Sequence, residues 1–128
     1  MTKQERMDVA NEFIRIVASY GRRFFSYSGR IGRFELGSRG HIYWRDEYTQ
    51  KRIYTHYLYD WRGFSNGGTM RGLVIALREF IAGRGSLPLG ALGPWPNYVC
   101  GGDLWGYGAD EMEQVRAKCR AMAKRVAS

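Results

Sequence analysis

Two short runs of this chain mirror each other: residues 41–45 are His-Ile-Tyr-Trp-Arg, and residues 52–56 are Arg-Ile-Tyr-Thr-His. If residues 46–51 turn the chain back, the second run pairs antiparallel with the first. Side chains alternate between the two faces of a strand, so every second residue of both runs shares one face. The sequence therefore predicts a β-hairpin. The opposed pairs on the shared face are His41 with His56, Tyr43 with Tyr54, and Arg45 with Arg52.

The two faces of this predicted hairpin differ in character. One face suits a core, because it carries Ile42, Trp44, Ile53 and Thr55. The other face is cationic and aromatic, and two arginines oppose each other on it. Like charges in that arrangement are unfavourable unless an anion neutralises them, and nucleic acid is such an anion. The alternative is a solvated face on which the tyrosines cover the arginine stems.

Charge supports the same interpretation. The chain has 128 residues, which fits a single domain over residues 1–128, and its hydrophobic fraction of 45% is that of a folded protein. Its net charge is +8, from 20 Lys and Arg against 12 Asp and Glu, and 16 of the 20 are arginine. The planar fork of arginine favours phosphate contacts and stacking. Arginine-rich composition of the genome is the alternative, because charge indicates partners and not the fold.

The remaining periodic segments predict an α+β fold. Apolar residues recur with helical spacing over 3–20, 69–82 and 110–126, and residues 33–36 form a short strand before the hairpin of residues 41–59. We expect a three-stranded antiparallel sheet packed by these three helices. Thr2 and Glu5 have the spacing of a capping box, and Thr69 is the candidate N-cap of the second helix.

The Gly-, Pro- and aromatic-rich segment at 84–108 is expected to be an ordered loop, because a polar linker would not carry four large aromatic side chains. Trp and Tyr are favoured anchors at protein interfaces, so the loop is either a partner-binding rim or a cap over the core. The candidate partner-binding residues are Trp95, Tyr98, Trp105 and Tyr107.

A second candidate anion site is the Ser-Asn-Gly-Gly-Thr run at 65–69, which opens a helix and has Arg62 before it and Arg71 after it. Backbone N–H groups at such a helix start are placed to hold a phosphate. The run lacks the lysine and the spacing of a P-loop, and plain helix capping is the alternative.

Enzyme chemistry has one candidate pair. His41 and His56 are a candidate acid–base pair for metal-free phosphodiester cleavage, with Arg45 or Arg52 holding the phosphate. Two histidines on a sheet are more often surface residues. No paired carboxylates and no His/Cys/Asp cluster accompany them, so we expect no catalytic residue, metal or cofactor.

The cysteines and the hydropathy of the chain bear on where in the cell the protein is located. Cys100 and Cys119 are the only cysteines, without metal-ligand spacing. These two cysteines either form one disulfide or remain as two buried free thiols, and we favour the free thiols. The N-terminus lacks an apolar signal core, and no segment approaches about 18 uninterrupted apolar residues, so we expect a soluble intracellular protein with no membrane partner.

The order of helix, three antiparallel strands and helix is similar to that of the double-stranded-RNA-binding domain. Residues 33–82 also resemble the AP2-like arm-binding domains of phage integrases, whose sheet enters the major groove. Residues 68–72, Gly-Thr-Met-Arg-Gly, lack the lysine cluster that double-stranded-RNA-binding domains place there. As a whole the chain resembles small phage or prophage accessory proteins, several of which are anti-defence factors such as anti-CRISPR proteins. That resemblance implies the cytoplasm of a bacterial host cell.

Together these observations predict a non-enzymatic binding protein that contacts nucleic acid or a nucleoprotein. The contacting residues would be His41, Tyr43, Arg45, Arg52, Tyr54, His56, Arg62 and Arg71. An inhibitor that binds a host defence or regulatory protein through the aromatic loop is the alternative. A small metal-independent phosphodiesterase is the third.

Overall fold

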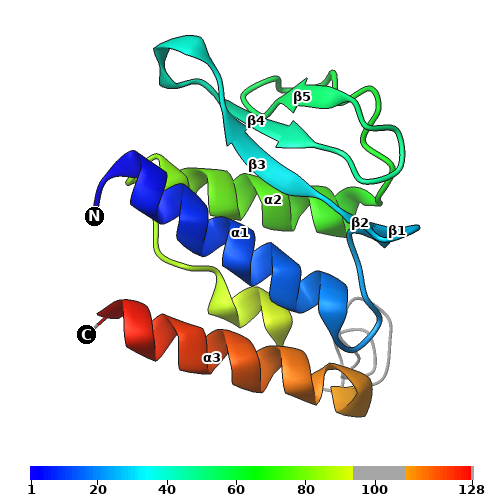
Figure 1. Ribbon diagram of the computed structural model, residues 1–128, viewed down its shortest axis with the longest axis vertical. Coiled ribbons are helices and arrows are strands. Elements are labelled where there is room, and N and C mark those ends of the chain that lie inside the picture. The colour runs from blue at the N-terminus through cyan, green and yellow to red at the C-terminus, as the bar shows by residue number, and fades with distance from the viewer. Residues whose placement is uncertain (94–108, 128) are drawn as a thin grey trace.

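The computed structural model describes residues 1–93 and 109–127, which form an α+β fold around one hydrophobic core (Figure 1). Helix α1 (Lys3–Ser19) contacts α2 (Gly68–Ile81), α3 (Glu113–Ala127) and the sheet. In Figure 1 the sheet lies at one end of the molecule, α1 and α2 lie next to it, and α3 lies at the other end. The strands are β1 (Ser26–Tyr27), β2 (Arg30–Ile31), β3 (Arg33–Leu36), β4 (Ile42–Arg45) and β5 (Arg52–Tyr54).

The three predicted helices are present, with two changed beginnings. Helix α1 begins with the expected capping box: the hydroxyl of Thr2 accepts from the backbone N–H of Glu5 at 3.1 Å, and the Glu5 carboxylate accepts from the backbone N–H of Thr2 at 2.8 Å. Helix α2 is capped by Gly67, so the prediction of Thr69 as its N-cap is wrong. A short 3₁₀ turn at Ala109–Met112 precedes α3, so the α-helix itself begins at Glu113.

The three-stranded sheet has the predicted antiparallel order β3-β4-β5. Tyr43 opposes Tyr54 and Arg45 opposes Arg52, which confirms two of the three pairs predicted from the mirrored runs. The paired strands are shorter than the predicted hairpin of residues 41–59, because a turn at residues 55–56 ends β5. Both the N–H and the hydroxyl of buried Thr55 donate to the Ile42 carbonyl, at 3.3 and 2.8 Å.

The inner face of the sheet packs on the helices around Trp44, which is fully buried. The Trp44 ring meets Phe25 and Phe34 edge to face, with centroids 5.2 and 5.0 Å apart. The side chain of Asn11 on α1 pairs with both backbone groups of Phe34, at 3.1 and 2.7 Å. Because Asn11 satisfies polar groups on the edge strand β3, it ties α1 to the sheet and protects that edge from pairing with another chain.

The small β1–β2 hairpin was not predicted. Ser28 and Gly29 join its strands with positive φ angles of 49° and 78°, as in a tight two-residue hairpin turn. Gly32 follows directly, and a Cβ atom there would collide with the Trp44 ring. The hairpin is therefore held close to the buried tryptophan.

The predicted loop at 84–108 and one of the two cysteines lie partly or wholly outside the described residues. Of the segment at 84–108, residues 84–93 are described, and they include a short 3₁₀ turn at Leu89–Leu92 in which Leu92 is buried. Cys119 is a buried free thiol, and burial raises the pKa of that thiol to about 12. Cys100 lies outside the described residues. Within them, no helix has the length and apolar character needed to cross a bilayer.

Candidate functional site

The site predicted from the mirrored runs lies on the solvent side of the three-stranded sheet. Pleating directs alternate side chains of the three strands to this side, where they form two cross-strand rows. In the first row Arg33 opposes Arg45, which opposes Arg52; in the second Glu35 opposes Tyr43, which opposes Tyr54. These six residues are called the outer face below.

Glu35 neutralises part of the charge in the arginine row. Its carboxylate lies 3.0 Å from Arg33 Nη2, 3.0 Å from Arg45 Nη2 and 3.4 Å from Arg52 Nε. The anion required by two opposed arginines is thus partly supplied by the protein itself. Three guanidinium groups share this one carboxylate, so the cluster keeps an excess of positive charge.

Burial tends to raise the pKa of Glu35, but the hydrogen bond from Arg45 and the charges of all three arginines outweigh it. The pKa of Glu35 therefore lies below its ordinary value, and the carboxylate is ionised at neutral pH. The alternation of Arg33 and Glu35 with the apolar residue Phe34 indicated that both side chains point outward. Their ion-pair partners could not be predicted, because these depend on the register of all three strands.

The second row is aromatic. The Arg52 guanidinium lies over the Tyr43 ring, 4.0 Å from its centroid, in a cation–π contact. Tyr54 is the centre of a ring cluster, with centroids 5.6 Å from Tyr43 and 5.1 Å from Tyr57. A row of arginines and a row of half-buried tyrosine rings therefore lie side by side on this surface, as the sequence predicted.

The two histidines lie beside this row. The centroids of His41 and His56 lie 5.5 and 5.4 Å from that of Tyr54, so each histidine ring contacts the tyrosine. Burial, followed by the charges of Arg78 and Arg84, lowers the pKa of His56, which is consequently neutral at pH 7. The ladder ends at Tyr54, so the third predicted pair, His41 with His56, lies beyond the paired strands and next to the outer face.

A small hollow adjoins the arginine row. Its volume is about 260 Å³, and it is lined by Arg30 from β2, by Arg33 and Arg45, and by the acidic residues Asp46 and Glu47. Arg30 donates from Nε to the Glu47 carbonyl at 2.9 Å, and Arg45 donates from Nη1 to the Gln50 carbonyl at 3.0 Å. Arginines from three strands and two acidic residues therefore line the same concave spot, so its charge is mixed.

The run at 65–69 does not have the surroundings expected of an anion site, because two buried carboxylates face it. Asp46 accepts from the backbone N–H and the hydroxyl of Ser65 at 2.8 and 3.0 Å. Glu47 accepts from the amide of Asn66 at 3.0 Å. A phosphate at this segment would meet negative charge.

The two arginines that flank this run bind nearby loop groups. Arg71 donates from Nη2 to the Leu58 carbonyl at 2.7 Å, and its guanidinium carbon lies 5.1 Å from the centroid of the Trp61 ring. Arg62 has a side chain 94% exposed and pairs with Asp60 at 3.4 Å. The partners of Arg62 and Arg71 are therefore loop residues, and none of them belongs to the outer face.

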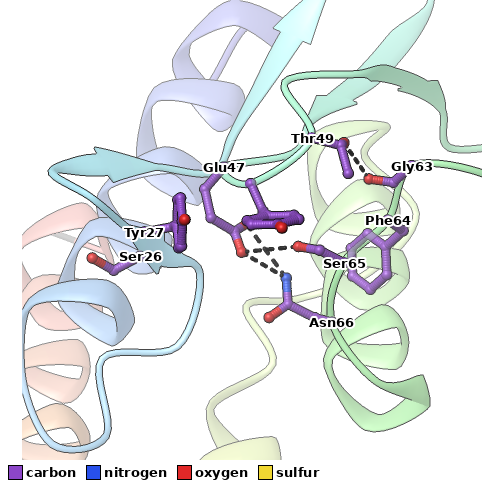
Figure 2. A pocket seen from close by; sticks show the side chains of 9 residues that line it. Ser26, Tyr27, Glu47, Thr49, Gly63, Phe64, Ser65 and Asn66 are labelled. Carbon is purple, nitrogen blue, oxygen red and sulfur yellow. Dashed lines mark hydrogen bonds between the residues drawn. The ribbon is translucent and has the colours of Figure 1, made fainter.

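A cleft of about 610 Å³ lies beside these carboxylates, and sequence reasoning missed it. Figure 2 shows Tyr27 of the β1–β2 hairpin on one side of the cleft and Phe64 on the other, with Glu47, Ser65 and Asn66 between them. Tyr48 and Thr49 also line the cleft. Its residues come from segments that no single sequence motif connects.

Trp95, Tyr98, Trp105 and Tyr107, the candidate partner-binding residues, lie outside the described residues. Among residues 1–93 and 109–127, no three His, Cys, Asp or Glu side chains are grouped as a metal site.

The described residues define a small α+β protein whose sheet exposes arginines and tyrosines. The chain belongs to the YoqU family, whose family model matches residues 1–124. No curated protein matches the chain, and no solved structure does.

Proposed function

We propose that this protein is a non-enzymatic accessory factor of the phage type that binds nucleic acid, or a nucleoprotein, through the outer face. Membership in the YoqU family, whose name suggests a Bacillus phage or prophage protein, supports the phage part of the proposal. The cytoplasm of a bacterial host is the corresponding location.

The observation that carries the binding proposal is the arginine row. Arg33, Arg45 and Arg52 lie side by side on three strands with one carboxylate among them. Each guanidinium has five N–H donors, and Glu35 accepts only a few of them. The tyrosine row offers rings on which bases stack.

The test compares two charge-matched double variants. Arg33→Gln with Arg52→Gln removes two charges from the outer face. Arg120→Gln with Arg125→Gln removes two exposed charges from α3, at the other end of the molecule (Figure 1). Binding to a fluorescent DNA or RNA oligonucleotide is followed by anisotropy at several salt concentrations.

The wild-type protein should contact about 4 to 6 phosphates, which gives a log–log salt slope of roughly −3 to −5. The outer-face variant should lose about two units of that slope, and the α3 variant should keep it. Equal losses in both variants would mean that net charge alone drives binding. Absence of binding to any DNA or RNA at about 50 mM salt would refute the proposal.

A further inference from the structure

The cleft in Figure 2 contains an aromatic corner. The rings of Tyr27 and Tyr48 meet edge to face, with centroids 4.7 Å apart and planes at 85°. Both rings are about half exposed, at 47% and 55%, so they remain accessible from solvent. Phe64 lies across the cleft from Tyr27.

Glu47 lies on the cleft wall between these rings and is only 5% exposed. Its carboxylate accepts from the Ser65 hydroxyl at 3.3 Å and from the Asn66 amide at 3.0 Å, and both donors are neutral. The preceding residue, Asp46, is 1% exposed. In the part of the chain that the structure describes, neither acid forms an ion pair.

A buried carboxylate without a cationic partner is costly, because neutral donors offset only part of its lost hydration. A cation placed in the cleft would compensate the charge of Glu47 and face the electron-rich rings at the same time. Tyr27 already attracts such a group, since the Arg30 guanidinium carbon lies 5.5 Å from its ring centroid.

The ring geometry distinguishes between flat and cationic ligands. A nucleobase sandwich needs two parallel rings, whereas Tyr27 and Tyr48 are nearly perpendicular. Perpendicular rings beside a carboxylate form the walls of a cage around a compact cation. We infer that this cleft binds an organic cation, with a guanidinium or ammonium group directed at Glu47 and its alkyl chain against Tyr48 and Phe64. The inference does not depend on the outer face.

Basic side chains of a protein partner and free polyamines share this chemistry, so the test includes both. The intact protein is titrated with N-acetyl-arginine methylamide, N-acetyl-lysine methylamide and putrescine, and the backbone amide signals of Ser65 and Asn66 are followed by NMR. The citrulline derivative, a neutral analogue of the arginine derivative, is the ligand control, and guanosine tests for a base. About 0.15 M salt limits long-range repulsion by the basic chain, because the screening length is then about 8 Å.

Saturable shifts with at least one cation, and none with citrulline, are expected, and the cation that binds identifies the source. Glu47→Gln should weaken binding at least about tenfold. Tyr48→Leu should weaken it about three- to tenfold. Tyr59→Leu, at a tyrosine that is 91% exposed and does not line the cleft, should bind as the wild type does.

Three results would overturn the inference: equal binding of the citrulline and arginine derivatives, binding of guanosine alone, or full affinity in Glu47→Gln. Near-UV circular dichroism reports whether Glu47→Gln folds. If it does not, Tyr48→Leu decides the question, because its exposed ring can be removed without disturbing the core. Unchanged affinity in Tyr48→Leu then counts against the cage.

Discussion

Glu35→Gln should destabilise the protein and at the same time strengthen its binding to nucleic acid. The substitution keeps the size of the side chain but removes the charge that Arg33, Arg45 and Arg52 share. Partly exposed ion pairs contribute about 0.2–1 kcal/mol each. The Glu35 side chain is 22% exposed, so its pairs are screened less than fully exposed ones, and a total loss of about 1–2 kcal/mol is expected.

The gain in binding follows from the same loss of charge. A carboxylate about 6 Å from a bound phosphate repels it by roughly 0.7 kcal/mol in water. Removing that repulsion should tighten binding about threefold. The two effects have opposite signs only if the arginines that Glu35 holds are also the groups that bind.

Urea unfolding followed by tryptophan fluorescence measures the first effect, and anisotropy titration measures the second. Glu113→Gln is the matched control, because Glu113 also pairs with two arginines, Arg116 and Arg120, but on α3. It adds the same net charge at the other end of the molecule and should leave binding nearly unchanged. If Glu35→Gln weakens binding, or leaves both quantities unchanged, the outer-face argument is wrong.

The difference in stability between wild type and Glu35→Gln should also depend on pH. The folded-state pKa of Glu35 lies below its ordinary value of 4.5, so its stabilisation is fully present above that value. As the pH falls below 4.5 and through the folded-state pKa, the carboxylate is protonated and the stabilisation disappears. The two unfolding curves should therefore converge in acid.

Further predictions concern the core and the aromatic row. Leu77→Ala, at a fully buried position of α2, should cost about 2–5 kcal/mol in urea unfolding, and a change below about 0.5 kcal/mol would contradict the packing of that helix. Gly32→Ala should cost about 1–3 kcal/mol, because the added methyl group forces Trp44 to move; unchanged stability would show that the hairpin adjusts freely. Tyr54→Ala should weaken binding by about 1–3 kcal/mol in anisotropy titrations if a base stacks there, and normal binding by a less stable variant would mark the ring as structural.

Periodicity in the sequence was sufficient to predict the sheet and the helices. In the mirrored runs a side-chain period of two fixes both the pairing and the face, so the register of β4 and β5 followed once the turn was placed. The helical stripes were equally informative, because the buried residues of α1 recur at the expected spacing. The β1–β2 hairpin was missed because two-residue strands are too short to show a period.

The parts of the site that were missed depend on contacts distant in sequence. Glu35 was recognisable as an outward residue of its strand, but its three partners appear only when all three strands are in register. Asp46 and Glu47 lie in the segment predicted simply as a turn. Their hydrogen-bond partners Ser65 and Asn66 lie almost twenty residues later, so local pattern did not indicate a cleft.

The outer face differs from the other arginine clusters of the described residues in its balance of charge. Glu79 and Glu113 are each paired with two arginines, whereas Glu35 is paired with three. The excess positive charge of the outer face makes no contribution to the core, because the buried side chains of the sheet all lie on its inner face. Opposed like charges instead cost up to about 1 kcal/mol per pair. A bound phosphate would relieve that repulsion and accept N–H donors that Glu35 leaves free, which is the physical reason for proposing that the outer face binds an anionic ligand.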